Sequence, residues 1–558
     1  MSGPGVATGL VLVGLLVAIG LTARMWAHAT TADFYLAGRS VGVITNAFAI
    51  CGDYFSAASF LGVAAAVYAF GLDGVWYATG FAAGFIPVLL FVAAPLRRFG
   101  DYSIPDFLGK RFDDERVRVV AVVIVELIIL AYLVPQIVGA GMTWQVLVGH
   151  GIGGLSPYAT GVIASATLTG GLVALGGMRG TTWTQAVQFC FLLATLLWLT
   201  VAALDHGFTY PAAVADASAE PLVEVTHEDG GAHLGVVRDQ LTGGAATFGS
   251  PGARYGAVGA FALLVTLVAG TTGLPHVMNR FFTSPSGRAA RMTTVWVLGL
   301  AGGFYALAVL LGTAARVVIP GAVADRPWLS ELTLDGVLEV PEHALLVLGR
   351  LWGGTSGLGV VAAGALVAII STIGGLLLAA AASFGHDLYE RHVNRSASQR
   401  QALLAAQAAV VVATLAAVGL AFVFRPERVA ESVPSVVATM VTWAFALAGS
   451  SLTPVLLMAI WWPRATARGM LAAMVTGAVL VPVAIVVGFA RGAPDSGLTS
   501  LLMAPTIVAA PVAIAVGVVL SRRDSPPVDI DATWTRLHGT AADRRTERLA
   551  RLTSRTAR

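Results

Sequence analysis

Residues 49–60 read AICGDYFSAASF, which places the carboxylate of Asp53 and the hydroxyls of Ser56 and Ser59 in the middle of an apolar segment. In hydrocarbon an unpaired backbone amide or carbonyl is costly, so a span interrupted by polar residues or glycine usually lines a cavity rather than lipid. We therefore predict a broken helix here. Burying a carboxylate costs at least about 2.5 kcal/mol on insertion scales, so Asp53 is expected to be paired, protonated or facing water, as a helix cap or as a ligand.

A second stretch of the same kind lies further along the chain. Residues 268–276 read VAGTTGLPH, with two glycines around Thr271 and Thr272 and then a proline. Inverted-repeat transporters place a discontinuous helix at corresponding positions of each half, with substrate and ion between the two. A single such segment would favour tight helix packing, but the matched pair favours a binding site halfway across the membrane.

The composition agrees with a membrane protein. The chain has 558 residues, of which 56% are hydrophobic and only 12% charged, and its mean hydropathy is +0.79. These values exclude a set of soluble domains. Both cysteines, Cys51 and Cys190, lie in apolar stretches, so no disulfide framework is expected.

Apolar runs bounded by charge, glycine or proline predict about 13 transmembrane helices of about 20 residues each. They cover Val6–Thr22, Ile44–Phe70, Val75–Leu96, Val117–Val148, Ala159–Leu175, Trp183–Leu204, Val258–Phe281, Met292–Ile319, Gly357–Ser383, Leu403–Phe424, Val433–Trp461, Met470–Ala490 and Leu501–Leu520.

Most of the 34 lysines and arginines fall on one side if the N-terminus is outside, so the positive-inside rule predicts an outer N-terminus and a cytoplasmic C-terminus. We expect a retained first helix, although Ala27-His28-Ala29 imitates a signal-peptidase site. The expected division is 1–43, a leading helix; 44–204, a first repeat of five helices; 205–257, an outer polar loop; 258–461, a second repeat; 462–521, two trailing helices; and 522–558, an arginine-rich tail.

Three polar segments invite other interpretations. The stretches 205–255 and 320–342 are predicted to be surface loops, and the histidines and acids of residues 227–233 match no strong metal motif. The tail is attributed to anionic lipid headgroups rather than to nucleic acid. We expect no obligate protein partner.

The ninth predicted span carries a candidate cation site. Residues 368–372 read AIIST, and Ala368, Ser371 and Thr372 share one helix face by their i, i+3, i+4 spacing. Two hydroxyls and a carbonyl suit a small hard cation, which prefers oxygen ligands. Ser and Thr in such helices more often bond their own i−4 carbonyl, so ligation is favoured only if a broken helix faces them.

Several motifs together resemble the sodium/solute symporter family, in particular its cation/acetate branch. They are DFYLAGR at 33–39, GDY at 52–54 with SAASFLG at 56–62, GGMRG at 176–180 with TWTQ at 182–185, and NRFFT at 279–283. The resemblance runs from about Asp33 to the tenth or eleventh span. It implies an all-α, five-plus-five inverted-repeat fold of the amino-acid/sodium symporter type.

The resemblance also implies functional residues. The family's sodium site falls on backbone carbonyls of Gly52, Phe55 and Ala368 and on the hydroxyls of Ser371 and Thr372. An acidic residue common in the family is here Gln185, which puts the sodium exit route, and the choice of sodium over protons, in question.

The expected function is inward symport of acetate or a similar short monocarboxylate, driven by a sodium or proton gradient across the cell membrane. No catalytic residues and no cofactor besides the transported cation are expected, since no nucleophile and base pair, metal cluster or phosphate loop is present. The pocket candidates are Asp53, Ser56, Ser59, Thr271 and Thr272, because half-helix N-termini attract anions. The alternatives are a proline or other amino-acid symporter and a membrane sensor of the same fold.

Overall fold

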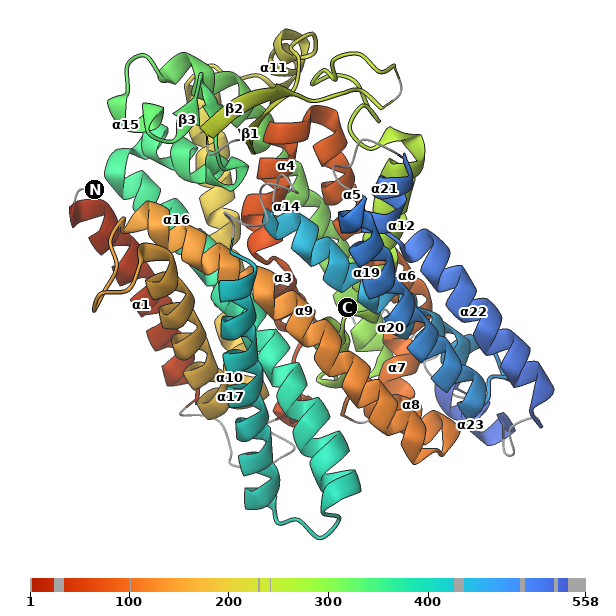
Figure 1. The fold of residues 1–558 in the computed structure, drawn as a ribbon. Coiled ribbons are helices and arrows are strands. Elements are labelled where there is room, and N and C mark those ends of the chain that lie inside the picture. The colour runs from red at the N-terminus through yellow and green to blue at the C-terminus, as the bar shows by residue number, and fades with distance from the viewer. Residues whose placement is uncertain are drawn as a thin grey trace, which may run out of the picture.

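The computed structural model describes residues 3–24, 35–100, 102–228, 231–240, 242–425, 436–491, 497–525 and 530–539. It is a bundle of helices with two small hairpins at one end (Figure 1). Each of the 13 predicted apolar segments is mainly helical where the structure describes it, with short interruptions in four of them, at residues 55–56, 84, 274 and 504–505. By length and hydropathy, ten helical stretches among the described residues could cross a membrane.

The elements of the first half follow the chain without long gaps. They are α1 (Gly3–Arg24), η1 (Ala37–Arg39), α3 (Val43–Tyr54), η2 (Ala58–Gly62), α4 (Val63–Phe70), η3 (Gly71–Gly74), α5 (Val75–Ala83), α6 (Phe85–Pro87), η4 (Val88–Val92), α7 (Ala93–Phe99), α8 (Ile104–Phe112), α9 (Glu115–Leu147), α10 (Pro157–Asp205), α11 (Tyr210–Ala217), β1 (Val223–Glu228) and β2 (Gly231–Val236).

The second half repeats the pattern of long helices. It comprises α12 (Gly256–Gly273), α13 (Pro275–Phe282), α14 (Gly287–Ala322), α15 (Pro327–Ser330), β3 (Thr333–Leu334), β4 (Val337–Leu338), η5 (Pro341–His343), α16 (Ala344–Ala382), η6 (Ser383–Val393), α17 (Gln399–Val423), α19 (Val436–Trp461), α20 (Ala467–Ala490), α21 (Gly497–Met503), α22 (Thr506–Arg523) and α23 (Ile530–His538).

Both helices that were predicted to be broken are broken. The first ends at Tyr54, and helical structure resumes at Ala58. The second ends at Gly273 and restarts at Pro275, because Leu274 has an extended backbone (φ −68°, ψ 117°) and proline is favoured in the first turn of a helix. The second break thus follows the two threonines instead of running through them.

Two further helices bend at glycines with positive φ. Gly177 (φ 59°) separates the fifth and sixth predicted spans within α10, and Gly354 (φ 61°) interrupts α16 near its start. A left-handed φ is readily accessible only to glycine, so the chain can change direction at these points without strain.

The segments predicted to be surface loops are more ordered than expected. Residues 205–255 contain α11 and the antiparallel hairpin β1–β2, and residues 320–342 contain α15 and the hairpin β3–β4. The first segment is held by Asp73, whose Oδ2 accepts the Arg254 amide at 2.7 Å. A small apolar cluster beneath it stabilises the arrangement; its members are Val67, Ala217, Leu222, Val237, Ala246, Phe248 and Ala253. Polar composition alone did not indicate these contacts.

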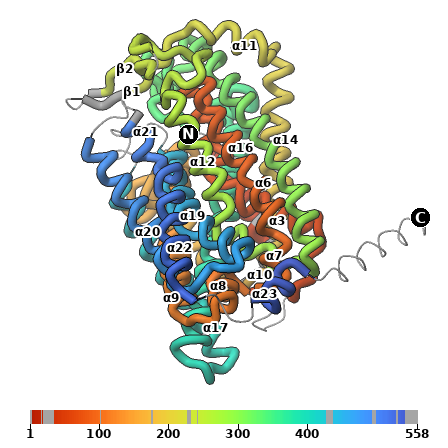
Figure 2. The backbone as a smooth tube through the Cα atoms, turned by 90° about the vertical axis from the view of Figure 1, so that its right-hand side faces the viewer, coloured from red at the N-terminus to blue at the C-terminus, as the bar shows by residue number. Residues whose placement is uncertain are grey.

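The helices differ in how much of their surface the bundle covers. In the apolar windows of α16 and α19, 94% and 89% of residues are buried, compared with 22% in α17 and 28% in α20. The first pair therefore forms the centre, and α17, α20 and α22 lie at the periphery (Figure 2). We call the end that carries β1–β4 the hairpin end, and the end that carries α8, η6 and α23 the α8 end (Figure 1).

Several of the sequence predictions fall wholly or partly outside the described residues. They include the signal-like stretch Ala27-His28-Ala29, the first two residues of the DFYLAGR motif, part of the 227–233 segment, the start of the Val433–Trp461 span and most of the arginine-rich tail, of which the structure describes 522–525 and 530–539.

Close packing of α14 against α4 gives a test of the fold. A Cβ at Gly312 would lie 2.5 Å from the Ala64 carbonyl oxygen, whereas one at Gly302 in the same helix would meet nothing within 4 Å. We expect Gly312→Ala to destabilise the protein by about 1–3 kcal/mol, because the Ala64 carbonyl can avoid the added methyl group only if the backbone of α4 shifts. Gly302→Ala should leave the apparent melting temperature in detergent unchanged or raise it. Equal melting temperatures for the two variants would contradict the α4–α14 packing.

Candidate functional site

The break after α3 frees backbone carbonyls in the middle of the bundle. Phe55 leaves the helical region (φ −79°, ψ 81°), and the Ser56 amide donates to the Tyr54 carbonyl at 2.9 Å. The next amide, of Ala57, donates to a side chain of α9 at 3.0 Å. In a continuous helix these two amides would pair with the carbonyls four residues earlier. The carbonyls of Gly52 and its neighbour therefore lose their helical partners.

Helix α16 presents its two hydroxyls to this break. Thr372 Oγ1 donates to the freed Asp53 carbonyl at 2.8 Å, so the threonine bonds across to α3 instead of to its own helix. Ser371 Oγ is buried and has no partner among the described residues, and Ala368 is fully buried. Ligation by Ser371 and Thr372 was expected only if a broken helix lay opposite them, and the break after α3 meets this condition. The arrangement can supply several oxygen ligands to a small hard cation.

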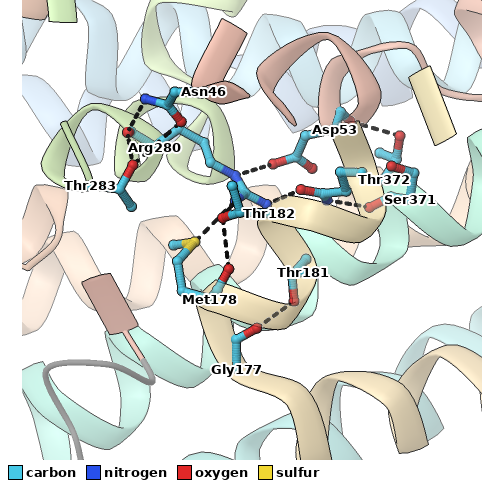
Figure 3. Close-up of polar contacts among 11 residues, drawn as sticks. Asn46, Asp53, Gly177, Met178, Thr181, Thr182, Arg280, Thr283, Ser371 and Thr372 are labelled. Carbon is cyan, nitrogen blue, oxygen red and sulfur yellow. Dashed lines mark hydrogen bonds and ion pairs between the residues drawn. The ribbon is translucent and has the colours of Figure 1, made fainter. Parts of the chain in front are cut away.

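A buried ion pair lies beside these oxygens. The Arg280 guanidinium in α13 donates from Nε to Asp53 Oδ2 at 3.2 Å, and both side chains are at most 1% exposed. The carboxylate is therefore paired with a protein group (Figure 3). The remaining guanidinium nitrogens reach the second half of α10, where NH1 donates to Thr182 Oγ1 at 2.8 Å and NH2 donates to Gln185 Oε1.

Gln185 links this ion pair to the hydroxyl pair. Its Nε2 donates to the Ser371 carbonyl at 2.8 Å, while its Oε1 accepts from Arg280. Together with the bond from Thr372 to the Asp53 carbonyl, these contacts close a ring of hydrogen bonds (Figure 3). The ring joins α3, α10, α13 and α16. A shift of the half-helix α13 would therefore move the hydroxyls of Ser371 and Thr372 relative to α3.

Two glycines allow the elements of the ring to approach. A Cβ at Gly52 would lie 2.2 Å from the Gln185 carbonyl oxygen, and one at Gly375 would lie 1.8 Å from Asp53 Oδ1. Any other residue at either position would push α3 away from α10 or α16.

The second break meets the first through a hydrogen bond. Tyr54 OH lies 2.8 Å from Thr271 Oγ1 and also donates to the Phe81 carbonyl at 3.0 Å. Thr271 and Thr272 lie in the last turn of α12 and donate to carbonyls four residues earlier. The ends of α3 and α12, at the two breaks, thus contact each other directly. The Thr272 hydroxyl faces its own helix.

Donor groups without partners surround the first break. Ser56 Oγ and Gln136 Nε2 are buried and have no hydrogen-bond partner among the described residues, although Gln136 Oε1 accepts the Ala57 amide. Both ring nitrogens of His276 are likewise unpaired. Ser59 lies further along, 2.8 Å from Tyr305 OH. Buried polar groups are nearly always satisfied, so these groups are available to a polar ligand.

Sequence analysis did not single out Arg280, Gln136 or His276 as site residues. Arg280 occurs there only within the NRFFT motif at 279–283, yet its guanidinium is a member of the hydrogen-bonded ring. A polar residue next to Pro135 in an otherwise apolar helix was the available signal for Gln136. The contacts of Arg280 join residues 53, 182 and 185, which no local pattern could have brought together.

A cleft of about 260 Å³ opens beside the ring, at the starts of α3 and of the second half of α10. Its lining residues are Ala37, Ser40, Val41, Gly42, Thr45, Arg179, Thr182 and Trp183. Since Thr182 accepts from Arg280, the guanidinium lies between this cleft and the hydroxyl pair.

The buried ion pair makes a testable contribution to stability. We expect Arg280→Met or Asp53→Asn alone to cost about 3–5 kcal/mol, because each leaves an uncompensated buried group. The double variant should lose much less than the sum, since neither charge remains. Unfolding monitored in detergent for the four proteins of this cycle measures the coupling; additive losses would contradict the pairing.

The fold and the motifs match known proteins. The Sodium:solute symporter family matches residues 34–477. A Na+-coupled sialic acid symporter in a substrate-bound outward-open state is similar in structure, with a TM-score of 0.68 at 14% identity, covering 94% of this chain and 99% of the other.

The nucleobase-cation-symport-1 family transporter Mhp1, in a closed conformation with bromovinylhydantoin bound, has a TM-score of 0.53 at 12% identity, covering 90% of this chain and 98% of the other. At these identities the likenesses establish the fold alone, and they confirm the predicted all-α, inverted-repeat transporter fold. The family match covers most of the chain. The chain therefore belongs to the sodium:solute symporter family and is a multi-pass membrane transporter of the sodium-coupled symporter type.

Proposed function

We propose that the protein couples inward movement of acetate or a similar short monocarboxylate to a sodium gradient by alternating access, and that it is not an enzyme. The observation that carries this proposal is the meeting of freed α3 carbonyls with the Ser371 and Thr372 hydroxyls. Protons remain the alternative coupling cation, and proline or another amino acid the alternative substrate.

The proposed sodium ligands are the carbonyls of Gly52, Phe55 and Ala368 and the hydroxyls of Ser371 and Thr372. In the structure Thr372 Oγ1 donates to the Asp53 carbonyl, which the break in α3 leaves without its helical partner. Ser371 Oγ has no partner among the described residues. A bound cation would replace that hydrogen bond and hold α3 against α16. Such a link favours one arrangement of the repeats, which is how an ion could promote an outward-open state that accepts substrate.

For the substrate we propose donors at the first break. A carboxylate needs hydrogen-bond donors, and Ser56 Oγ, Gln136 Nε2 and the His276 ring offer unpaired ones. Ser59 and Thr271 line the same region, and Thr272 is retained as a lining residue with its hydroxyl turned inward to its helix. Asp53 would repel the carboxylate of the substrate, so we assign it a positioning role, in which it holds Arg280 through the ion pair.

The aromatic side chains around the break limit the size of this substrate. Phe55 stacks on Phe304 with ring centroids 4.0 Å apart, and Phe81 lies 5.7 Å from Tyr305 and 5.2 Å from Phe445. A small organic acid suits a region packed this closely. A sugar would need the rings to separate.

We further propose that the N-terminus and the hairpin end face outside and the α8 end faces the cytoplasm, as the distribution of cations predicts. The two repeats are assigned to 44–204 and 258–461, preceded by the leading helix and followed by two trailing helices.

The coupling proposal is tested by uptake into proteoliposomes. Radiolabelled acetate should accumulate against its gradient when sodium is imposed outside, and unlabelled propionate or pyruvate should compete while proline does not. Accumulation driven only by a proton gradient would contradict sodium coupling. Competition by proline alone would contradict the monocarboxylate assignment.

The sodium ligands predict a change in cation affinity. Thr372→Ala and Ser371→Ala should each raise the half-saturating sodium concentration about 10-fold, equivalent to about 1.4 kcal/mol, because one oxygen ligand is lost. Thr294→Ala is a matched control, since Thr294 is a buried threonine that bonds its own helix at Ala290. Unchanged sodium dependence in both site variants would contradict the assignment.

The substrate donors predict a change in KM. Gln136→Leu should raise the KM for acetate at least about 10-fold through the loss of one charge-assisted hydrogen bond. An unaltered KM for a folded Gln136→Leu protein would remove this residue from the pocket.

A further inference from the structure

A second group of unpaired oxygens lies at the α8 end of the α16–η6 helix. Glu126 Oε1, Ser383 Oγ and Asp387 Oδ1 are buried and form no hydrogen bond of good geometry among the described residues. Ser383 and Asp387 are at most 1% exposed, and the Glu126 carboxyl of α9 interacts with the Ser383 hydroxyl and lies near Asp387. Because buried polar atoms are rarely left unsatisfied, three in one place indicate a missing ligand.

The carboxyl groups of Glu126 and Asp387 form no ion pair within 4.0 Å among the described residues, although His386 and Arg118 lie near Asp387. Asp106 is paired with Lys110 at 2.9 Å and with Arg118 at 3.3 Å. Glu390 lies 2.5 Å from Nδ1 of His386. Asp387 Oδ2 accepts only the neutral hydroxyl of Ser103.

The ligand that fits this group is a hard cation, and sodium is the one that the proposed function supplies. Hard cations prefer carboxylate and hydroxyl oxygens, and the carboxyl groups of Glu126 and Asp387 supply the negative charge. Ligand atoms of Asp106, His386 and Asp387 also lie within 4.8 Å of one another, which a transition metal could use. That metal would have to displace Lys110 and Arg118 from Asp106, so the oxygens of Glu126, Ser383 and Asp387 form the better site.

This group shares a helix face with the proposed sodium ligands. Residues 372, 375, 379, 383 and 387 follow one another at spacings of three or four, and the two between the sites are Gly375 and Ala379. Asp53 Oδ1, also unpaired, lies against Gly375. From Thr372 to Asp387 the helix rises about 22 Å, with oxygens at both ends of this face and the Asp53 carboxylate against Gly375 between them.

The alternative route toward the cleft at Thr182 carries a fixed positive charge. The Arg280 guanidinium bonds Thr182 and Gln185 there, so a departing cation would meet a like charge. Asp53 offsets this charge from the α3 side, and Gln185 adds no further negative charge on the side of the cleft. For a cation that leaves the first site, the electrostatic interactions therefore favour the route along the helix face that leads to Asp387.

We propose that Glu126, Ser383 and Asp387 form a second sodium site, which receives the ion that leaves Ser371 and Thr372 on its way to the cytoplasm. This inference rests on the proposed sodium coupling. It assigns the exit role, which the family resemblance gives to the acid replaced by Gln185, to Asp387 at the end of the helix that holds the first site and to Glu126 of α9.

Binding of radioactive sodium to the purified full-length protein tests the inference without any organic substrate. Wild type should bind about two sodium ions per chain, and Asp387→Asn and Thr372→Ala should each bind about one. Ser383→Ala should weaken the second site at least about 10-fold while preserving charge. Glu390→Gln is the matched control, because Glu390 is on the same helix segment but pairs with His386; it should bind like wild type.

The outcomes separate this inference from the proposed function. If Asp387→Asn binds as many ions as wild type while Thr372→Ala loses one, the second site is overturned and the first stands. If wild type binds no sodium, both are overturned. Ser103→Ala removes the hydroxyl that donates to Asp387 and keeps the carboxylate. If Asp387 had only a structural role, Ser103→Ala and Asp387→Asn would lower the melting temperature equally, and both variants would still bind two sodium ions.

Discussion

The structure depends on one constraint, namely that a backbone group in the middle of a membrane bundle must find a partner. At Phe55 the chain leaves the helix, and the amides that should pair with the Gly52 and Asp53 carbonyls turn elsewhere. Thr372 supplies a replacement donor from α16, and the remaining unpaired oxygens lie next to it. The break therefore both requires a neighbouring polar helix face and creates a place for a cation.

Arg280 extends this constraint to the rest of the bundle. A buried guanidinium needs several acceptors, and it finds them on α3 and α10. It comes from α13, the half-helix that follows the second break, while Asn46 of α3 donates to its backbone carbonyl at 3.1 Å. The broken helices of the two repeats are thus tied together by polar contacts, in a region where hydrophobic packing alone would not fix their register.

The sequence was sufficient for features that depend on local pattern. Hydropathy placed the spans, the GDY and GTTGLP stretches placed the breaks, and the spacing of Ser371 and Thr372 placed the hydroxyls on one face. It was insufficient for contacts between distant segments, such as Arg280 with Asp53 or Gln136 with Ala57, because helix packing decides them. The outer insert was also misjudged: its polar composition predicts a loop, but Asp73 and Phe248 anchor it to the bundle by interactions that composition does not encode.

The most direct measurement is the position of a sodium substitute in an experimental structure. Thallium ions, which scatter anomalously, should replace sodium in crystals of the full-length protein. The account predicts an anomalous peak between the Gly52 carbonyl and the hydroxyls of Ser371 and Thr372, and its loss in Thr372→Ala. A peak elsewhere in the bundle, with none at the break in α3, would contradict the account.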